Sequence, residues 1–194
     1  MHLEGTETQK NLARAFAGES QARNRYDFTA EQLRKEGQEY LYRVISEISR
    51  NEHAHARIFW DYLVQGTPGG FPNIAFDAGY PFSGGDSLAN LQSAAHGEAQ
   101  EATEIYPKFA EIARSENFPE IAASFEQIAR IEASHNQIFT TMREQLSGNT
   151  LYAKPNPITW KCENCGHTFT GSNVPAQCPV CHRPTGFFTT PLAP

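Results

Sequence analysis

Apolar side chains recur every three or four positions in four long stretches of the chain, and this period predicts four helices. Each stretch is bounded by turn-forming residues or by a loss of the period. We expect the helices at about residues 6–37, 38–65, 86–112 and 117–148.

The ends of these stretches carry helix signals. Thr6 and Asp86 stand where the first and third helices begin, and each can accept a hydrogen bond from a free backbone amide. Asn117 stands before the fourth helix and predicts another cap of this kind. Pro107 interrupts the third stretch and predicts a kink or local break, because proline lacks a backbone donor and clashes with the preceding turn.

A long irregular segment joins the second and third helices. Residues 66–85 hold six glycines and three prolines, which is too broken for a helix and too long for a tight turn between neighbours. We therefore predict a mainly α fold, a four-helix bundle with one long crossover.

Acidic and histidine side chains occupy positions on the apolar stripes of all four predicted helices. Some of them form two Glu-x-x-His pairs, which place a carboxylate and an imidazole on the same helix face. Burial of so many unpaired acids costs too much free energy, so we expect cations among them. A solvated acidic face is the alternative, and the repeated spacing argues against it. The candidate ligands are Glu19, Glu52, His55, Glu98, Glu101, Glu132 and His135.

The two halves of the bundle repeat one another at an offset of 79 to 80 residues. Gly-Glu-x-Gln at residues 18–21 matches the same pattern at residues 97–100, and a Glu-x-x-His pair follows each. Three residues after the glutamate, the first half has Ala22 and the second has Glu101. The bundle is therefore predicted to be a duplicated helix pair with one additional acid.

The number of acids indicates the metal. Against five carboxylates, two divalent ions leave one negative charge and two trivalent ions leave one positive charge. A pair of ions that cycles between these states keeps a buried site close to neutral. Oxygen-rich ligands with two imidazoles suit iron first and manganese second.

A cysteine-rich segment follows the bundle. The polar residues after Ser147, with Pro155 and Pro157, predict a linker, and the roughly forty residues that remain are too few to fold on an apolar core alone. Two Cys-x-x-Cys pairs supply four thiolates, which suit zinc or a single iron. We predict a bundle domain at 1–150 and a metal-stabilised domain at 151–194. The four candidate ligands are Cys162, Cys165, Cys178 and Cys181.

Composition and charge narrow the class of protein. The 194 residues are 39% hydrophobic, which is enough for a substantial core. The net charge is −6 and the basic residues are scattered, so we expect neither a nucleic-acid partner nor an anionic membrane partner. We find no signal-peptide pattern and no run of 18 apolar residues, and we expect a cytoplasmic protein.

Residues 17–26, Ala-Gly-Glu-Ser-Gln-Ala-Arg-Asn-Arg-Tyr, resemble the first-helix signature of the rubrerythrin family. Both Glu-x-x-His pairs and both predicted domains follow in that family's order, so the resemblance covers nearly the whole chain. It implies a ferritin-like four-helix bundle that holds two irons, followed by a small C-terminal rubredoxin-like metal-knuckle β domain.

The resemblance also implies a role for each ligand. The implied roles are bridging for Glu52 and Glu132, one iron for Glu19 and His55, and the other iron for Glu98 and His135. Glu101 would exchange with His55 on oxidation, because a ferric ion prefers an anionic oxygen ligand. Tyr26 and Tyr106 would hydrogen-bond the ligand carboxylates.

In the tail, the resemblance implies one redox-active iron on the four cysteines, for which zinc can substitute. Backbone amides near the sulfurs would tune its potential. His182 stands where rubredoxins usually have glycine, which affects the local turn. The small core of the tail would consist of Trp160, Phe169, Phe187 and Phe188.

The activity implied by the resemblance is reduction of hydrogen peroxide to water, in defence against oxidative stress. Electrons would pass through the four-cysteine iron from an external rubredoxin or NAD(P)H-dependent reductase, because the chain has no Gly-x-Gly-x-x-Gly fingerprint of its own. A homodimer or higher homo-oligomer, with electron transfer between subunits, is a further implication. Two alternatives are an iron-handling ferroxidase and a metal-binding scaffold with a structural zinc ribbon.

Overall fold

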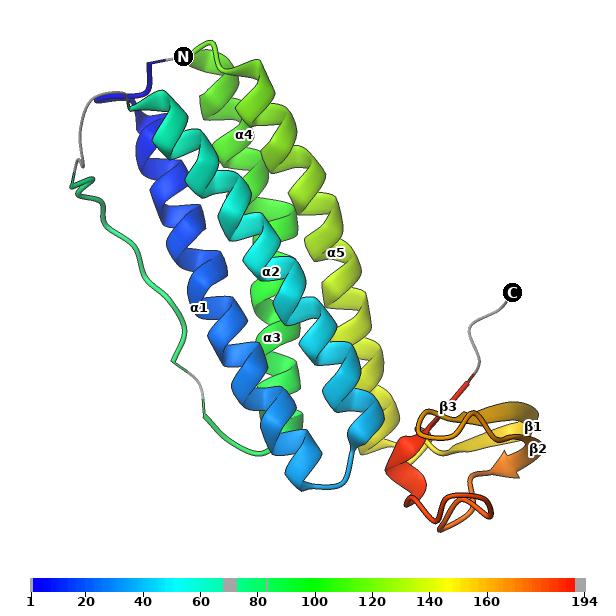
Figure 1. The fold of residues 1–194 in the computed structure, drawn as a ribbon. Coiled ribbons are helices and arrows are strands. Elements are labelled where there is room, and N and C mark those ends of the chain that lie inside the picture. Colours follow the sequence, from blue (N-terminus) through cyan, green and yellow to red (C-terminus); the bar gives the residue numbers. More distant parts are fainter. Residues whose placement is uncertain (1, 68–72, 83, 191–194) are drawn as a thin grey trace.

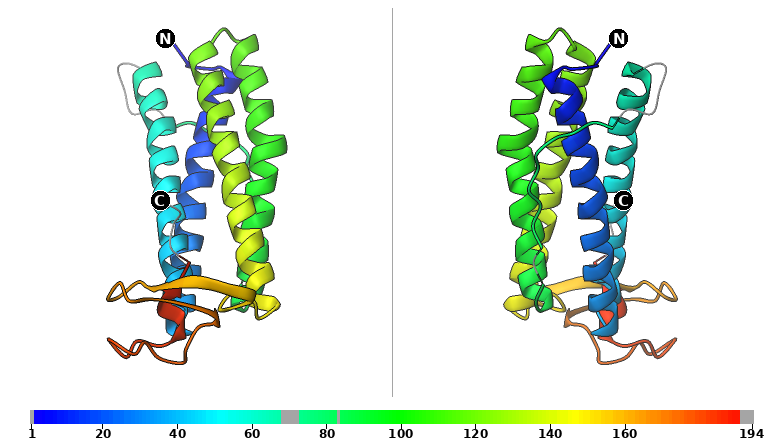
Figure 2. Two further views of the ribbon diagram at one scale, coloured as in Figure 1. Left: turned by 90° about the vertical axis from the view of Figure 1, so that its right-hand side faces the viewer. Right: turned by 90° about the vertical axis from the view of Figure 1, so that its left-hand side faces the viewer.

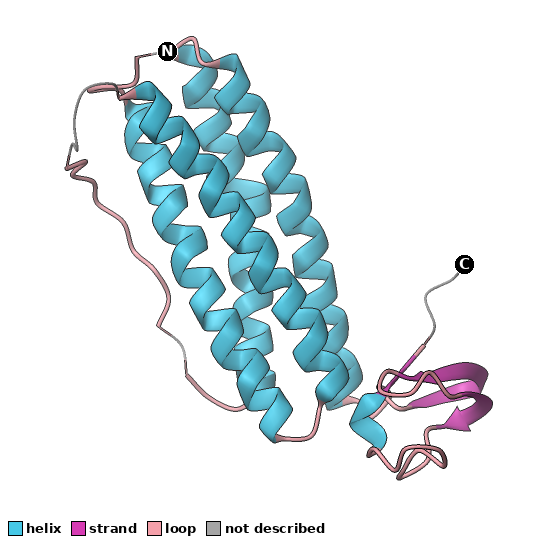
Figure 3. Ribbon diagram, viewed as in Figure 1, coloured by secondary structure: helices cyan, strands magenta, loops and turns pink. Residues whose placement is uncertain are grey.

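A computed structural model of the chain describes residues 2–67, 73–82 and 84–190. Within them, α1 (Glu7–Lys35) and α2 (Glu39–Gly66) form one antiparallel pair. The other pair consists of α5 (Pro119–Ser147) and a rod of three consecutive elements: α3 (Ser87–Gln100), η1 (Glu101–Ile105) and α4 (Tyr106–Ser115). The predicted mainly α bundle is confirmed, with a small sheet at one end (Figures 1 and 3).

The segment between α2 and α3 runs along the length of the bundle beside α1 (Figures 1 and 2), as the predicted crossover requires. Residues 68–72 and 83 of this segment lie outside the described residues. Arg14 of α1 holds the described part at two points. Its Nε donates to the carbonyl of Asp77 at 3.0 Å, and its own carbonyl accepts from the Tyr80 hydroxyl at 2.8 Å.

Two of the three predicted caps are present. The Thr6 hydroxyl accepts from the backbone amide of Gln9 at 3.1 Å, and the Asp86 carboxylate accepts from that of Ala89 at 2.8 Å. The prediction for Asn117 is wrong. Its backbone has a φ of 66°, so it terminates α4 in the left-handed conformation that asparagine tolerates, and α5 begins only after Phe118.

The break predicted at Pro107 is a single π-helical turn, η1, that ends just before it. Proline has no backbone amide to donate the next α-helical hydrogen bond. In the π turn the hydrogen bonds join residues five apart instead of four, so one additional residue is accommodated. The rod continues as α4, so the helix does not end at Pro107, but its faces are rotated by the π turn.

The apolar core of the bundle is divided into two clusters. One contains Leu12, Phe59 and Phe125, and the other contains Leu33, Phe139 and their neighbours nearer the sheet. On each long helix, the acidic and histidine positions fall between these clusters. The polar centre is therefore enclosed by apolar layers above and below.

The tail is a three-stranded antiparallel sheet in the order β2-β1-β3, formed by β1 (Ala153–Cys162), β2 (Thr168–Asn173) and β3 (Phe188–Thr189). The predicted linker is corrected here, because Pro155 and Pro157 lie inside β1. The β1–β2 register shifts between Ala153 and Ile158, so the prolines occupy an irregularity where the ladder needs no amide from them. The predicted core is confirmed, with Trp160 and Phe188 buried and Phe169 and Phe187 packed against them.

The tail is packed against the end of its own bundle, at the turn between α1 and α2 (Figure 1). A Cβ at Gly186, in η2 (Thr185–Phe187), would lie 1.7 Å from the carbonyl oxygen of Gly37, so only glycine fits. The Tyr152 hydroxyl donates to the Gln38 side chain at 2.7 Å. None of the helices within the described residues is long and apolar enough to cross a membrane.

Candidate metal centres

Six of the seven predicted bundle ligands meet at one point inside the helices. They form two groups of four, and within each group one potential ligand atom per residue lies within 4.8 Å of all the others. Glu52 and Glu132 belong to both groups. The remaining members are Glu19 and His55 in one group, and Glu98 and His135 in the other.

The two imidazoles are placed almost symmetrically about the shared acids. The Nδ1 atom of His55 lies 2.9 Å from Glu132 and 3.1 Å from Glu52. The Nδ1 atom of His135 lies 2.8 Å from Glu132 and 3.1 Å from Glu52, through the opposite carboxylate oxygens. Each shared carboxylate therefore turns one oxygen toward each half of the site, which is the arrangement of a bridging ligand for two ions.

Burial and unmet hydrogen bonds show that cations fit this cluster. The four glutamates are 0–1% exposed. Among them, Glu19, Glu52 and Glu98 each have one buried carboxylate oxygen without a hydrogen-bond partner within the described residues, and Glu132 has two. Buried carboxylate oxygens are costly unless a proton or a cation compensates them. Oxygen and imidazole donors in this number suit a pair of irons.

In the absence of a cation, bound protons compensate the negative charge of the buried carboxylates. Burial alone would lower the pKa of His55 and of His135, but the surrounding carboxylates outweigh burial and raise each pKa to about 12. Burial raises the pKa of Glu98 to about 8. Burial also opposes ionisation of Glu52, but the two imidazoles hold its pKa at about 2. Metal binding must therefore displace protons from this site.

Two buried tyrosines hold the outer carboxylates, each across the bundle from its own helix. The Tyr26 hydroxyl of α1 donates to Glu98 of α3, and the Tyr106 hydroxyl of α4 donates to Glu19 of α1. These contacts fix the two carboxylates that belong to only one group each. Each tyrosine therefore bonds to the glutamate of the other half of the sequence repeat.

Glu101, the additional acid, lies outside both groups of four. It is the first residue of η1 and is half-buried. Burial, with the nearby charge of Glu98, raises its pKa well above the ordinary value. A Cβ at Gly18 would be 3.8 Å from the Glu101 carboxylate, so this acid faces the glycine that precedes Glu19.

The four cysteines gather at the edge of the tail and form no disulfide. Their sulfurs lie within 4.8 Å of one another, and two of the Sγ–Sγ distances, Cys162–Cys181 and Cys165–Cys178, are 3.7 Å. A tetrahedron with metal–sulfur bonds of about 2.3 Å has edges of about 3.8 Å. The sulfurs are therefore already spaced for one tetrahedral ion.

Backbone amides support the cysteine site. A hydrogen bond from the backbone of Arg183 lowers the pKa of Cys181 to about 6. His182, between them, has a φ of 57° and donates its amide to the Cys178 carbonyl at 2.9 Å. This is the left-handed conformation that glycine adopts most readily, and His182 adopts it here.

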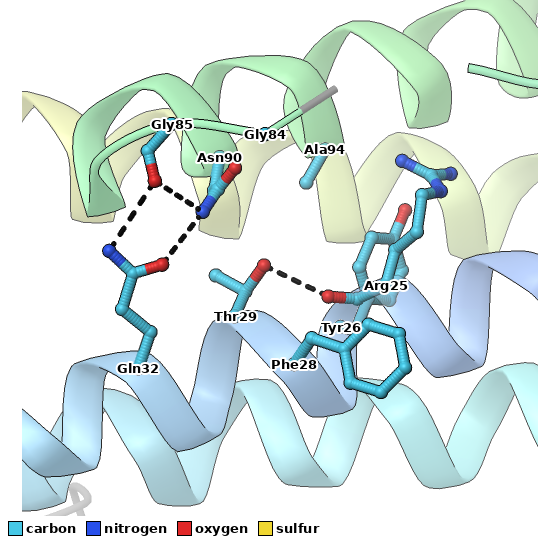
Figure 4. A pocket seen from close by; sticks show the side chains of 9 residues that line it. All are labelled: Arg25, Tyr26, Phe28, Thr29, Gln32, Gly84, Gly85, Asn90 and Ala94. Atoms are coloured by element: carbon cyan, nitrogen blue, oxygen red, sulfur yellow. Dashed lines mark hydrogen bonds between the residues drawn. The ribbon is translucent and has the colours of Figure 1, made fainter. Parts of the chain in front are cut away.

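Of two cavities that lie between α1 and the α3–η1–α4 rod, one is lined by a predicted ligand. The first, about 280 Å³, lies between α1 and the start of α3 (Figure 4). Its polar groups bond to one another, since Asn90 donates to Gln32 at 3.0 Å and Thr29 donates to the Arg25 carbonyl at 2.9 Å. The second, about 420 Å³, is lined by Glu101 and Tyr106.

Comparison with known families identifies the family of this chain. The family model described as Rubrerythrin matches residues 10–143, with a second match over 89–161, and the model described as Rubrerythrin, rubredoxin-like domain matches residues 160–189. This chain belongs to the rubrerythrin family. Family membership makes it a di-iron protein with a rubredoxin-like four-cysteine iron site, within a family of oxidoreductases.

Similar rubrerythrins are known from several bacteria. Rubrerythrin-1 of Clostridium acetobutylicum is 39% identical over 186 residues, which cover 96% of this chain and 95% of that protein. Rubrerythrin of Porphyromonas gingivalis is 40% identical over 188 residues, which cover 96% and 90%. The solved structure of fully reduced, all-ferrous nigerythrin is 25% identical, with a TM-score of 0.63 over 97% of this chain and 91% of that one. The ferritin-like fold is thereby confirmed.

Sequence reasoning missed some of the residues that line the second cavity. Tyr80 lies in the crossover, where no periodic pattern marks a side chain as inward-facing. The π turn was visible only as a break at Pro107, since the sequence does not reveal how a proline will be accommodated. Gly18 was part of the repeated Gly-Glu-x-Gln pattern, but the sequence does not show that it faces Tyr80 and Glu101.

Proposed function

We propose that this rubrerythrin-family protein is a non-haem di-iron peroxidase that reduces hydrogen peroxide to two waters. The observation that carries the proposal is the presence in one chain of a site for two ions, with shared carboxylates, and a site for one ion on four sulfurs. Reduction of one peroxide takes two electrons and two protons. A two-ion site can supply both electrons, and a one-ion site can return electrons to it one at a time.

The chain's own residues would hold and shield the reaction. When bound, the paired irons supply two electrons to the O–O bond. Tyr26 and Tyr106 orient Glu98 and Glu19 through their hydroxyl groups. Phe59 and Phe125 stack beside Tyr106 and exclude water from one end of the site. Glu101, which stands apart from both groups of four, is available to exchange with His55 when charge increases at the centre.

An external donor must supply the electrons, and the proposal assigns this role to a rubredoxin or an NAD(P)H-dependent reductase. Cys165 is exposed and Cys181 is half-buried, so the sulfur site is open to such a partner. We further propose a cytoplasmic protein that acts in oxidative-stress defence. The ferroxidase alternative gives no role to the rubredoxin-like tail. The zinc-ribbon alternative leaves the di-iron site without a source of electrons, because zinc does not change its oxidation state.

The position of the tail supports a homodimer. Glu52 lies about 20 Å along α2 from the end where its own tail is docked, at 1.5 Å per residue. The contacts of Gly186 and Tyr152 hold the tail at that end. In the proposed dimer, the tail of one chain lies beside the bundle centre of the other.

The relay is tested by Cys165→Ser. Removing one thiolate should leave one rapid peroxide reduction by the pre-reduced protein, because the bundle site is untouched. Steady turnover with an external donor should fall at least about a hundredfold, since the refilling route is lost. Stopped-flow and steady-state assays measure the two rates separately.

Val180→Ser is the matched control, because Val180 is exposed beside the sulfurs and all four thiols remain. An unchanged steady rate in Cys165→Ser would refute the relay. A colourless protein that holds one zinc per chain after anaerobic purification would instead favour the scaffold alternative. Metal analysis and the visible spectrum decide between the two.

A further inference from the structure

The cavity of about 420 Å³ lies between α1, the crossover and η1, and Glu101 and Tyr106 are part of its lining. Glu101 is itself a predicted ligand and Tyr106 donates to another, Glu19, so the wall of this cavity includes the edge of the di-iron centre. The first cavity also lies beside α1, but its polar groups are already paired (Figure 4).

Most of the exposed surface inside this cavity is apolar, although charged and polar side chains such as Arg25, Gln100 and Lys108 also line it. Ala15, Tyr80, Pro81, Ile105 and Phe109 contribute to the lining. Cavities of a few hundred Å³ with apolar walls and few convergent polar groups are typical of sites for organic ligands. Hydrogen peroxide is scarcely larger than water and gains little from such walls.

Tyr80 is held in the cavity wall by a hydrogen bond, and Gly18 lies between its ring and Glu101. The Tyr80 hydroxyl donates to the Arg14 carbonyl at 2.8 Å, which holds its ring over the bundle. At Gly18, an added Cβ would be 3.7 Å from the Tyr80 ring and 3.8 Å from the Glu101 carboxylate. The absence of a side chain at this position leaves a gap between the ring and the acid.

We propose that this cavity binds the organic group of a small alkyl or aryl hydroperoxide, so that such hydroperoxides are a second substrate class beside hydrogen peroxide. The organic group lies against Tyr80, Pro81 and Phe109, and the peroxide group points toward Glu101. The reaction rests on the proposed function. The O–O bond of ROOH breaks, two electrons from the external donor and two protons are taken up, and ROH and water leave.

Two variants and one control test the assignment. Tyr80→Ala removes the outer wall, and Gly18→Ala fills the gap at Glu101 while favouring the helix. Phe82→Ala is the control, because Phe82 is on the same segment but 95% exposed and outside the cavity. We expect each variant to lower the ratio of kcat/KM for cumene hydroperoxide to that for hydrogen peroxide about tenfold. Phe82→Ala should leave this ratio unchanged.

A binding measurement separates this proposal from the proposed function. The alcohol product, 2-phenyl-2-propanol, is titrated into the oxidised holoprotein by calorimetry, which requires no turnover. Binding that weakens about tenfold in Tyr80→Ala and not in Phe82→Ala supports the cavity, even if neither peroxide is reduced and the proposed function fails. No binding to the unchanged protein, or equal binding by both variants, overturns the assignment while peroxidase activity stands.

Discussion

Glu52 and Glu132 each face both imidazoles, and this shared position is what joins two ligand sets into one centre. Glu19 and Glu98 each belong to one group only, and a tyrosine hydroxyl donates to each of them. Among the five predicted carboxylate ligands, only Glu101 is neither shared between the two groups nor bonded to a tyrosine. It is also the one acid that has no counterpart in the first half of the repeat.

At this scale we predict the effect of Glu101→Ala. Both irons should remain bound, because the six grouped ligands do not depend on Glu101. Reoxidation of the reduced protein by hydrogen peroxide should slow about tenfold or more, as the loss of an outer ligand commonly does at metal sites. Metal analysis and stopped-flow absorbance measure the two quantities.

Glu104→Ala is the appropriate control for that variant, since Glu104 is exposed on the same π turn. Normal reoxidation kinetics in Glu101→Ala would end the ligand-exchange hypothesis. Loss of one iron would show instead that Glu101 is a permanent ligand.

At the scale of elements, the period of apolar residues was sufficient for the four helices and for the stripe that carries the site. Thr6 and Asp86 were recognisable because a cap needs only one side chain and the next turn. Asn117 was misread, because asparagine serves equally well to begin a helix and to end one. Pro155 and Pro157 were misread because a register shift in β1 is set by its partner strand.

The start of α1 depends on an acid from a distant loop. The Glu116 carboxylate, which follows α4, accepts from the backbone amides of Glu7 and Thr8 at 3.0 and 2.7 Å, and from the Thr8 hydroxyl at 2.5 Å. Burial opposes its ionisation, but these bonds outweigh burial and lower the pKa of Glu116. A carboxylate at a helix N-terminus also complements the helix dipole.

Glu116→Gln should therefore destabilise the bundle by about 1–2 kcal/mol, because charge-assisted bonds become neutral ones. Thermal unfolding of the metal-loaded protein measures the change, and Glu31→Gln at an exposed position of α1 is the matched control. Equal unfolding temperatures for the two variants would contradict the capping role. Since the pKa of Glu116 is lowered, its contribution is present above about pH 4.5 and is lost as the pH falls below it.

At the scale of the whole molecule, the metal-free bundle should become less stable as the pH rises from 7 to 9. The pKa of Glu98 is raised from 4.5 to about 8, and those of His55 and His135 from 6.5 to about 12. Over these windows the folded state binds more protons than the unfolded state, so stability falls with increasing pH. The lowered pKa of Glu52, at about 2, acts only in acid.

We expect the unfolding temperature of the metal-free protein to fall by about 5 °C or more between these pH values. The iron-loaded protein should show a much smaller change, because cations replace the protons. Circular dichroism melts of both forms measure the difference. A metal-free protein with a flat profile would show that its buried acids are compensated in another way.

The contact between tail and bundle is a second property of the whole molecule. Gly186→Ala should displace the tail, since its Cβ would lie 1.7 Å from the Gly37 carbonyl oxygen. The visible spectrum of the cysteine site should be unchanged, whereas the radius of gyration measured by X-ray scattering should increase. Gly171→Ala, within the sheet of the same tail, serves as the control, and an unaltered radius in Gly186→Ala would show that other contacts suffice.

Leu151 is buried with the bundle core, and β1 begins two residues later. The linker between the bundle and the tail is therefore too short for the tail to move far. The cysteine site can pass electrons only to a metal centre that lies beside it. Its own acidic cluster is some 20 Å further along α2. Under the proposed function, steady turnover then requires two associated chains. Dilution should therefore reduce steady peroxide turnover per chain, although every chain retains all of its iron.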